Sequence, residues 1–195
     1  MSSGALPSDV PGAGARGSGG PARARRAEAA EARAGSAALP YVWAATRLAL
    51  GWVFLWAFLD KLFGLGHDTP SESSWLDGGN PTEGYLSGSR GAFSGIYHDI
   101  AGGWLVNWLF MLGLLFVGVT MILGIAMHLG AAAGALMSVL MWTAMLPPAS
   151  NPFMDDHIVY ALVFVGLALA AAGDTLGLGR WWASTPLVRR WRWLR

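Results

Sequence analysis

Apolar residues are concentrated in four stretches of the chain, separated by segments rich in Gly, Pro, Ser and charged residues. An α-helix rises about 1.5 Å per residue and the hydrocarbon core of a bilayer is about 30 Å thick, so about 20 apolar residues can cross it. The pattern therefore predicts an all-α integral membrane protein, folded as a bundle of four transmembrane helices. The expected helices cover residues 41–65, 103–127, 129–146 and 156–173.

The segments before and after the bundle differ in composition. Residues 1–38 are rich in Gly, Ala, Ser, Pro and Arg, so we expect a disordered tail in which residues 21–34 form at most a frayed helix. Residues 39–180 hold the membrane domain. Residues 181–195 combine Trp with Arg, which is typical of a segment on an anionic membrane surface, and nucleic-acid binding is the less favoured alternative.

The distribution of basic residues predicts the topology. Five arginines precede the first apolar stretch and five follow the fourth, whereas residues 66–102 hold one arginine and five acids. Residues 147–155 hold no basic residue. Because Lys and Arg favour the cytoplasmic side of a membrane, we expect both termini in the cytoplasm and a long outer loop between the first two helices. An even number of crossings gives the same arrangement.

Composition agrees with a membrane location. Of the 195 residues, 54% are hydrophobic and 13% are charged, against about 25% charged in soluble domains. The chain has no cysteine, which excludes disulfides, thiolate metal sites and thiol chemistry by the chain itself. It also has no metal or haem motif, so we predict no metal site.

Charged residues inside the first apolar stretch are functional candidates, because a charge in the hydrocarbon core is costly. Arg47 lies near the expected cytoplasmic end, where it can reach the interface as a topology anchor or take part in binding. Asp60 and Lys61 lie near the outer end. Trp56 precedes Asp60 by four residues and shares its helix face.

A second polar group opens the fourth helix. Asn151 is a good N-cap and the following proline suits the first helical position, but these roles leave Asp156 and His157 unexplained. The expected topology puts them at the level of Asp60 and Lys61. An imidazole beside carboxylates can carry protons near neutral pH, which a quinone head group needs. A structural ion-pair network that seals the bundle is the alternative.

We therefore expect a quinone site at the outer membrane boundary, formed by the first and fourth helices. The candidates for proton transfer are Asp156, His157, Asp60 and Lys61. The candidates for quinone binding are Arg47, Trp56, Asn151 and Asp155.

Two further patterns concern packing. Residues 84–102 of the outer loop alternate Gly with apolar and aromatic residues, so we expect a short helix or lid over the bundle mouth. The third helix carries small residues at every fourth position, which lets helices approach closely. We favour packing inside the bundle over a dimer face for this stripe, which consists of Ala126, Gly130, Gly134 and Ser138.

Several motifs resemble the DoxX/DoxD family of small membrane proteins. Residues 47–62 resemble the family's first helix, and the resemblance extends to residues 80–88, 151–162 and 173–182 within a region of about residues 41–182. It implies a four-helix membrane bundle associated with redox complexes. One member type is the large subunit of thiosulfate:quinone oxidoreductase, which works with a small partner subunit. The composition, rich in Ala, Arg and Trp, is typical of a bacterium with GC-rich DNA, so we expect a bacterial plasma membrane.

Three functions remain in view. The favoured one is an integral membrane subunit of a quinone-linked redox complex, an oxidoreductase subunit that acts with a sulfur donor and quinone as acceptor. The alternative is a non-catalytic scaffold that anchors a redox or stress-response partner. A small transporter ranks last, because proline is absent from the span interiors. The expected partners are membrane lipid and a small subunit or redox enzyme. A homo-oligomer stays open, and we expect no nucleic acid.

Overall fold

The computed structural model describes residues 20–149 and 151–195, with their side chains from residue 23 onwards. The chain divides into two compact units, residues 1–38 and residues 39–195, and helix α1 (Gly20–Phe63) has residues in both. Residues 20–38 are helical, in the part of the expected disordered tail where a frayed helix over residues 21–34 was allowed. The rest of that expectation, for residues 1–19, lies outside the described residues.

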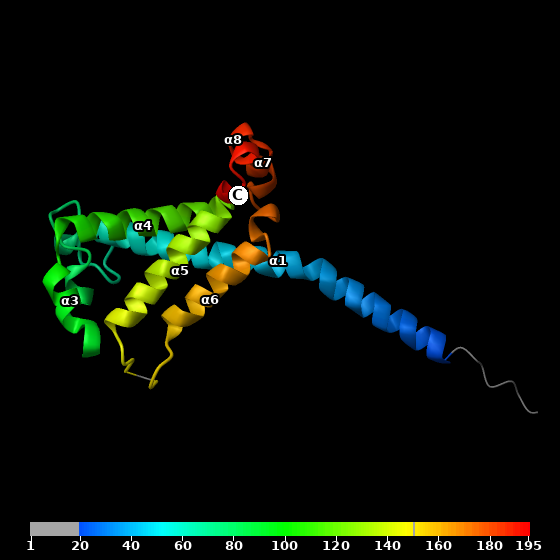
Figure 1. The fold of residues 1–195 in the computed structure, drawn as a ribbon, viewed down its shortest axis with the longest axis horizontal. Coiled ribbons are helices and arrows are strands. Elements are labelled where there is room, and N and C mark those ends of the chain that lie inside the picture. The colour runs from blue at the N-terminus through cyan, green and yellow to red at the C-terminus, as the bar shows by residue number, and fades with distance from the viewer. Residues whose placement is uncertain (1–19, 150) are drawn as a thin grey trace, which may run out of the picture. The chain divides into compact units, whose positions relative to one another are not determined.

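The unit of residues 39–195 is a bundle of helices, and no strand occurs among its described residues. Figure 1 shows α5 and α6 side by side, running in opposite directions, with α4 along α5. The bundle helices are the C-terminal part of α1, α4 (Trp104–Leu123), α5 (Met127–Ala144) and α6 (Asp156–Leu169).

Three of these helices, α1, α4 and α5, are long and apolar enough to cross a membrane. The third runs over Met127–Ala144 rather than over residues 129–146. Helix α6 has 14 residues, so it is shorter than the expected residues 156–173 and spans only about 21 Å. The prediction of an all-helical membrane protein is thus confirmed at the level of three membrane-length helices.

Short helices occupy the loop between α1 and α4, which keeps the name outer loop after its expected side of the membrane, and the C-terminal segment. In the outer loop, the hydroxyls of Tyr85 and Tyr97 donate hydrogen bonds to carbonyls near the C-terminal end of α5, so this loop packs on that end of the bundle. The outer-loop helices are η1 (Ser71–Ser73), α2 (Glu83–Ser87), η2 (Gly91–Phe93) and α3 (Ser94–Ile100). The C-terminal ones are η3 (Ala172–Asp174), α7 (Gly179–Ser184), α8 (Pro186–Arg190) and η4 (Arg192–Leu194).

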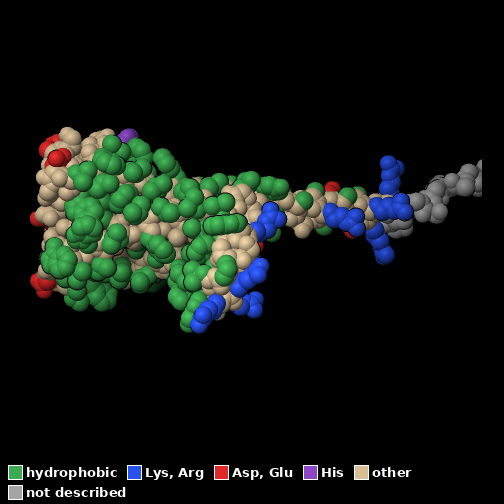
Figure 2. Space-filling model, turned by 90° about the horizontal axis from the view of Figure 1, so that it is seen from above, with side chains coloured by type: hydrophobic (Ala, Val, Ile, Leu, Met, Phe, Trp, Pro, Cys, Tyr) green, Lys and Arg blue, Asp and Glu red, His purple; other side chains and the backbone are tan. Residues whose placement is uncertain are grey.

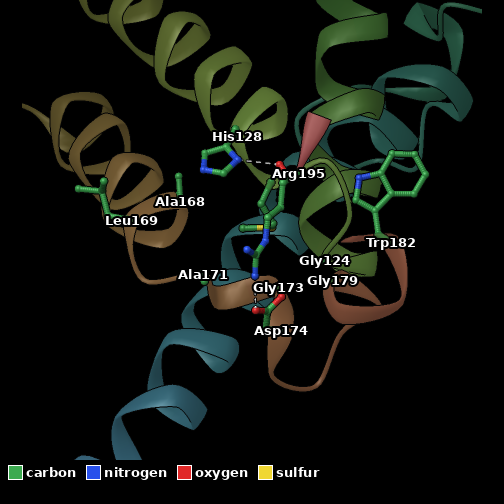
Figure 3. Close-up of a pocket in the computed structure, with 11 residues that line it drawn as sticks. Gly124, His128, Ala168, Leu169, Ala171, Gly173, Asp174, Gly179, Trp182 and Arg195 are labelled. Carbon is green, nitrogen blue, oxygen red and sulfur yellow. Dashed lines mark hydrogen bonds and ion pairs between the residues drawn. The ribbon is translucent and has the colours of Figure 1, made fainter. Parts of the chain in front are cut away.

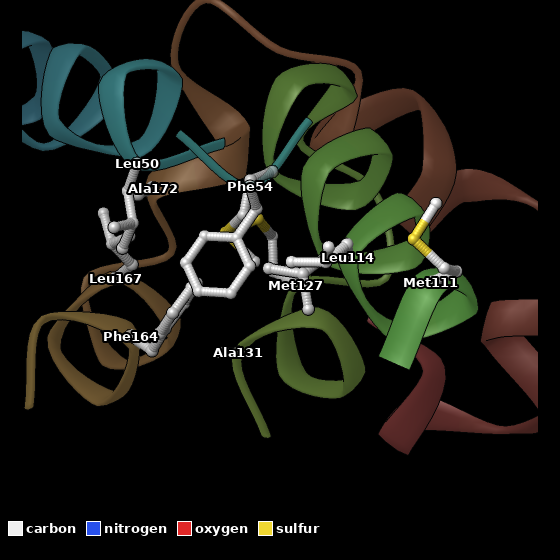
Figure 4. Close-up of a cluster of buried hydrophobic side chains, with 11 residues drawn as sticks. Leu50, Phe54, Met111, Leu114, Met127, Ala131, Phe164, Leu167 and Ala172 are labelled. Carbon is white, nitrogen blue, oxygen red and sulfur yellow. The ribbon is translucent and has the colours of Figure 1, made fainter. Parts of the chain in front are cut away.

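The core lies where the four bundle helices meet (Figure 4). Phe54 of α1 and Phe164 of α6 pack edge to face, with ring centroids 5.2 Å apart. Aromatic pairs of this geometry are more favourable than area burial alone. The surrounding buried side chains include Leu50, Leu114, Met127, Ala131 and Leu167.

The outward faces of the bundle are apolar as well. Trp104 is 75% exposed on α4, Leu136 is 61% exposed on α5 and Leu162 is 67% exposed on α6. Figure 2 shows hydrophobic side chains over most of the visible face of the bundle, with acidic side chains at the end that holds the outer loop. Apolar side chains inside and outside are what a bundle surrounded by lipid requires, so this surface fits association with membrane lipid.

Small residues allow the bundle helices to approach closely. A Cβ atom on Gly118 of α4 would lie 2.8 Å from the backbone nitrogen of Leu55 in α1. All four members of the small-residue stripe are buried, and a Cβ on Gly134 would collide with the ring of Phe164. The prediction that the stripe packs inside the bundle is therefore confirmed.

Candidate functional site

Arg47 is fully buried inside the bundle, with no solvent-exposed area. Its Nη1 donates hydrogen bonds to the carbonyls of Met121 and Ile122, the latter at 2.9 Å. Its Nη2 donates to the carbonyl of Leu176 at 2.9 Å and to that of Thr175 at 3.5 Å. One guanidinium thus joins α1, the end of α4 and the segment that follows η3.

These bonds satisfy the carbonyls left open at the end of α4. The last four carbonyls of a helix have no partner within the helix, and its C-terminal end attracts positive charge. Here the carbonyl of Thr120 accepts from the backbone of Gly124, and that of Leu123 accepts from the backbone of Leu178 at 2.8 Å. Arg47 supplies donors for the two carbonyls between them. Each open carbonyl of α4 therefore has a partner.

Close backbone approach makes room for this arrangement. Gly124 ends α4 in the left-handed region, with φ of 71°. A Cβ on Gly177 would lie 2.5 Å from the carbonyl oxygen of Gly173 and 3.1 Å from Nη2 of Arg47. The Gly-rich motif of residues 173–182 therefore has a structural role around Arg47. Both terminal nitrogens of Arg47 are bound to backbone carbonyls, a structural role that the sequence pattern did not predict, whereas the roles of topology anchor and quinone ligand stay predictions.

Asp60 also forms hydrogen bonds with the backbone. Its carboxylate is 2% exposed and accepts hydrogen bonds from the backbone N–H groups of His67 and Asp68, at 3.2 and 3.1 Å. Asp60 thus fixes the turn after α1. Lys61 makes no side-chain hydrogen bond or ion pair with the described residues, and Trp56 packs edge to face on the ring of His67 with centroids 5.2 Å apart.

Asp60 and Lys61 should consequently respond differently to loss of charge. We expect Asp60→Asn to lower the free energy of unfolding by about 1–3 kcal/mol. The amide N–H₂ of Asn cannot accept one of the two buried hydrogen bonds that the carboxylate accepts. We expect Lys61→Gln to change it by less than about 0.5 kcal/mol. Thermal unfolding in detergent measures both, and equal melting temperatures for the two variants would contradict the role given to Asp60.

The N-terminus of α6 is capped by Asp155, not by Asn151. The carboxylate of Asp155 accepts from the backbone N–H groups of His157 and Ile158, at 3.1 and 3.3 Å. Asn151 lies outside the helix, where its side-chain oxygen accepts from the backbone N–H groups of Phe153 and Met154. The expectation of an Asn151 cap with proline at the first helical position is therefore wrong, since the helix begins four residues later.

Asp155 and His157 form a hydrogen-bonded pair. Nδ1 of His157 lies 2.8 Å from Oδ2 of Asp155 and 3.5 Å from Oδ1 of Asp156. The side chain of His157 is 19% exposed and that of Asp155 is 13% exposed, whereas the side chain of Asp156 is 67% exposed. A carboxylate at Nδ1 fixes the orientation of the imidazole and leaves Nε2 as the ring nitrogen for proton exchange.

Tyr85 completes this group and was not among the predicted site residues. Its ring lies 6.4 Å from that of His157, and its hydroxyl donates to the carbonyl of Met141 at 3.0 Å. Burial, followed by the negative charges of Asp155 and Asp156, raises the pKa of Tyr85 well above its ordinary value. The hydroxyl therefore stays protonated near neutral pH. Only tertiary packing brings Tyr85 here, because 70 residues separate it from Asp155.

The same group contains three potential metal ligands. One ligand atom each of Asp155, Asp156 and His157 lies within 4.8 Å of the others. The sequence motifs predicted no metal site, although these three residues are consecutive in the chain. The cap and hydrogen-bond roles already account for Asp155 and His157, and exposed acidic residues commonly gather without a metal.

The predicted site residues therefore fall into separate places. Asp155, Asp156 and His157 meet at the start of α6. Asp60 serves a turn, and no hydrogen bond or ion pair between described residues joins it to that group. Arg47 precedes Asp60 by 13 residues, or about 20 Å along the helix, so the two cannot hold one head group.

A cavity of about 200 Å³ lies at the opposite end of α5 and α6 (Figure 3). His128 borders it, and both its backbone N–H and its Nδ1 lie within hydrogen-bond distance of the Arg195 carbonyl, at 2.9 and 2.8 Å. The guanidinium of Arg195 pairs with Asp174 at 2.9 Å. The C-terminal segment thus docks on the bundle end, with Met127, Leu169 and Trp182 among the other residues that line the cavity.

Comparison of the chain with protein families, curated proteins and solved structures finds no match.

Proposed function

We propose that this chain is an integral membrane subunit of a quinone-linked redox complex, and that His157 exchanges a proton with quinone at the outer membrane boundary. The observation that carries the proposal is the 2.8 Å contact between Nδ1 of His157 and the carboxylate of Asp155. This contact orients the imidazole at the end of an apolar bundle. The resemblance to the DoxX/DoxD family supports the same function.

The proposal includes a topology with both termini in the cytoplasm. The arginine distribution supports it, and the acidic outer loop lies at the same end of the bundle as His157. A fourth crossing would need α6 together with the residues that follow it up to η3, because α6 alone is about 9 Å short of the hydrocarbon thickness. Labelling of introduced cysteines from each side of the membrane tests this topology.

Of the predicted site residues, we propose that His157 binds the quinone head group rather than the wider set. Arg47 and Asp60 are bound to the backbone, and the hydroxyl of Tyr85 is bound to a carbonyl. When bound, a quinone supplies two-electron, two-proton redox chemistry. His157 would hold or release a proton at Nε2, and Asp155 would stabilise the protonated imidazole. The electron donor would belong to a partner subunit.

Quinone content in single-residue variants tests this function. The tagged chain is extracted gently from its native membrane and its bound quinone is quantified by mass spectrometry. We expect near-stoichiometric quinone in the wild type and a loss of about tenfold in His157→Gln, because an amide cannot take up the proton that lets an imidazole donate a charge-assisted hydrogen bond to the head group. Quinone absent from the wild type, or unchanged in His157→Gln, would refute the proposal.

Asp155 offers a control that separates chemistry from folding. Serine is also a good N-cap, so Asp155→Ser should keep the stability of α6 while removing the carboxylate partner of His157. Asp155→Ala should lose both and be about 1 kcal/mol less stable. We expect reduced quinone in both variants but a lowered melting temperature only in the alanine variant. Asp156→Asn, at the exposed neighbour, should retain quinone.

A second candidate function is a membrane scaffold for a redox or stress-response partner. Apolar side chains are exposed on the outer loop, where Leu76 is 66%, Ile96 is 63% and Phe93 is 44% exposed. If this surface holds a partner, replacing Leu76 and Ile96 by serine should release a co-purifying protein without changing quinone content. Retention of every co-purifying protein would count against the scaffold.

A further inference from the structure

A hollow of about 300 Å³ lies on the surface of the C-terminal segment, far from His157 along the bundle. Three of the five residues that line it are arginines, namely Arg189, Arg192 and Arg195. The other two are Ala183 and Val188, and Val188 is only 3% exposed, so the floor is apolar and anchored. The hollow therefore joins several guanidinium groups to a fixed apolar base.

The positive charge in this hollow is largely uncompensated. Arg195 pairs with Asp174 at 2.9 Å, but Arg189 and Arg192 form no ion pair with any residue in 23–149 or 151–195. Both are exposed. Guanidinium groups bind phosphate oxygens through paired N–H donors, which makes arginine the preferred residue for phosphate recognition. A phosphate is therefore the group that best balances the positive charge of Arg189 and Arg192.

The segment that carries these arginines is folded and held against the membrane helices. The backbone N–H of Leu178 donates to the last carbonyl of α4, and the indole Nε1 of Trp182 donates to the carbonyl of Leu194 at 2.7 Å. The hydroxyl of Thr185 caps α8. These bonds place the hollow beside the ends of α4 and α6, at the boundary of the apolar bundle surface.

Exposed indoles surround the same segment. Trp181 is 61% exposed, Trp193 is 59% exposed and Trp191 is 49% exposed. Indoles are favoured at the level of lipid head groups, where the ring is partly in hydrocarbon and its N–H meets water. Arginines and tryptophans together at the boundary of a bundle match a phospholipid, with the phosphate in the hollow and the indoles among the acyl chains.

From these observations we infer that the hollow lined by Arg189, Arg192 and Arg195 binds the head-group phosphate of an anionic phospholipid. The inference is independent of quinone chemistry, because it concerns the other end of α5 and α6. It requires only that the bundle lies in a membrane. The phosphate of a bound anionic lipid would bridge the two unpaired guanidinium groups, offset part of their positive charge and hold the C-terminal segment at the membrane surface.

Lipid selectivity of the full chain tests the inference. The protein is purified in a neutral detergent and titrated with phosphatidylglycerol or phosphatidylcholine, and bound lipid is counted by native mass spectrometry. We expect tight binding of one phosphatidylglycerol. We expect the double variant Arg189→Gln/Arg192→Gln to bind it about tenfold or more weakly, since each basic residue near an anionic membrane contributes about fivefold. Binding of phosphatidylcholine should be weak in both proteins.

A charge-matched control is available in the N-terminal helix. Arg23→Gln/Arg26→Gln removes the same two charges at exposed positions outside the hollow, so it should leave phosphatidylglycerol binding within about twofold of the wild type. Equal losses in the two double variants would overturn the inference, since net charge alone would then explain the binding. Unchanged binding in the Arg189/Arg192 variant would overturn it as well.

Two competitors decide between sources of phosphate. Inorganic phosphate at millimolar concentration should not displace the lipid, because it lacks the acyl chains that the exposed indoles contact. A short DNA duplex should not displace it either. Displacement by phosphate would reduce the site to a simple anion site, and displacement by DNA at matched concentration would assign the surface to nucleic acid. Either result would overturn the proposed lipid site.

Discussion

Replacement of Arg47 by methionine is expected to remove most of the folded protein from the membrane. The substitution keeps an apolar stem but takes away the donors of the bonds to the carbonyls of Met121, Ile122 and Leu176. Each buried carbonyl left without a partner costs about 1–3 kcal/mol. The summed loss of at least about 3 kcal/mol is a large share of the stability of a typical domain.

The measurement is the monodisperse fraction in size-exclusion chromatography after detergent extraction, followed by thermal unfolding of the material that survives. Arg90→Met is the matched control, because Arg90 is exposed and makes no side-chain hydrogen bond or ion pair with the described residues. Arg47→Lys should fall between wild type and Arg47→Met, since one ammonium cannot reach both α4 and the segment after η3. If Arg47→Met had the wild-type melting temperature, the end of α4 would not depend on this guanidinium for its stability.

The second large effect is expected from adding one methyl group to Gly118. The new Cβ would lie 2.8 Å from the backbone nitrogen and 2.9 Å from the Cα of Leu55, so α1 and α4 must move apart. Backbone cannot rotate away as a side chain can, and overpacking of this kind costs about 1–3 kcal/mol. We therefore expect Gly118→Ala to lower the melting temperature and the yield of folded protein.

Gly113 provides the control within the same helix. A Cβ there would meet the sulfur of Met137 at 2.7 Å, which is the flexible part of a long side chain. Alanine is also the better helix former by about 1 kcal/mol. Gly113→Ala should therefore be neutral or slightly stabilising. Comparable destabilisation of both variants would mean that glycine in α4 serves a purpose other than close contact with α1.

The hydrophobic pattern was enough to predict membrane-length helices, because burial in lipid demands continuous apolar segments whatever the packing. It was less informative about α6. Residues 170–173 are apolar or small, yet the helix ends at Leu169, and Ala171 adopts a left-handed conformation with φ of 48°. The turn made there brings Leu176 to Arg47, and a hydropathy pattern does not show that this contact requires the helix to end.

The same contrast appears in the polar residues. Sequence reasoning identified Asp155, Asp156 and His157 as a group because they are adjacent, and local geometry confirms their contact. It also placed Arg47 and Asp60 in a shared site, because charged residues within membrane helices are commonly functional. Tertiary structure gives them backbone partners instead. A sequence does not show which carbonyls and N–H groups remain open when helices and turns assemble.

By itself, the sequence determined the helical class, the membrane-length spans, the burial of the small-residue stripe and the polar start of α6. These features follow from local periodicity, composition and residues close together in the chain. Only the tertiary structure decided that Asp155 is the cap, that Tyr85 lies beside His157, and that Arg47 closes the end of α4. The physical reason is that unsatisfied backbone groups and distant side chains find their partners only when the bundle is packed.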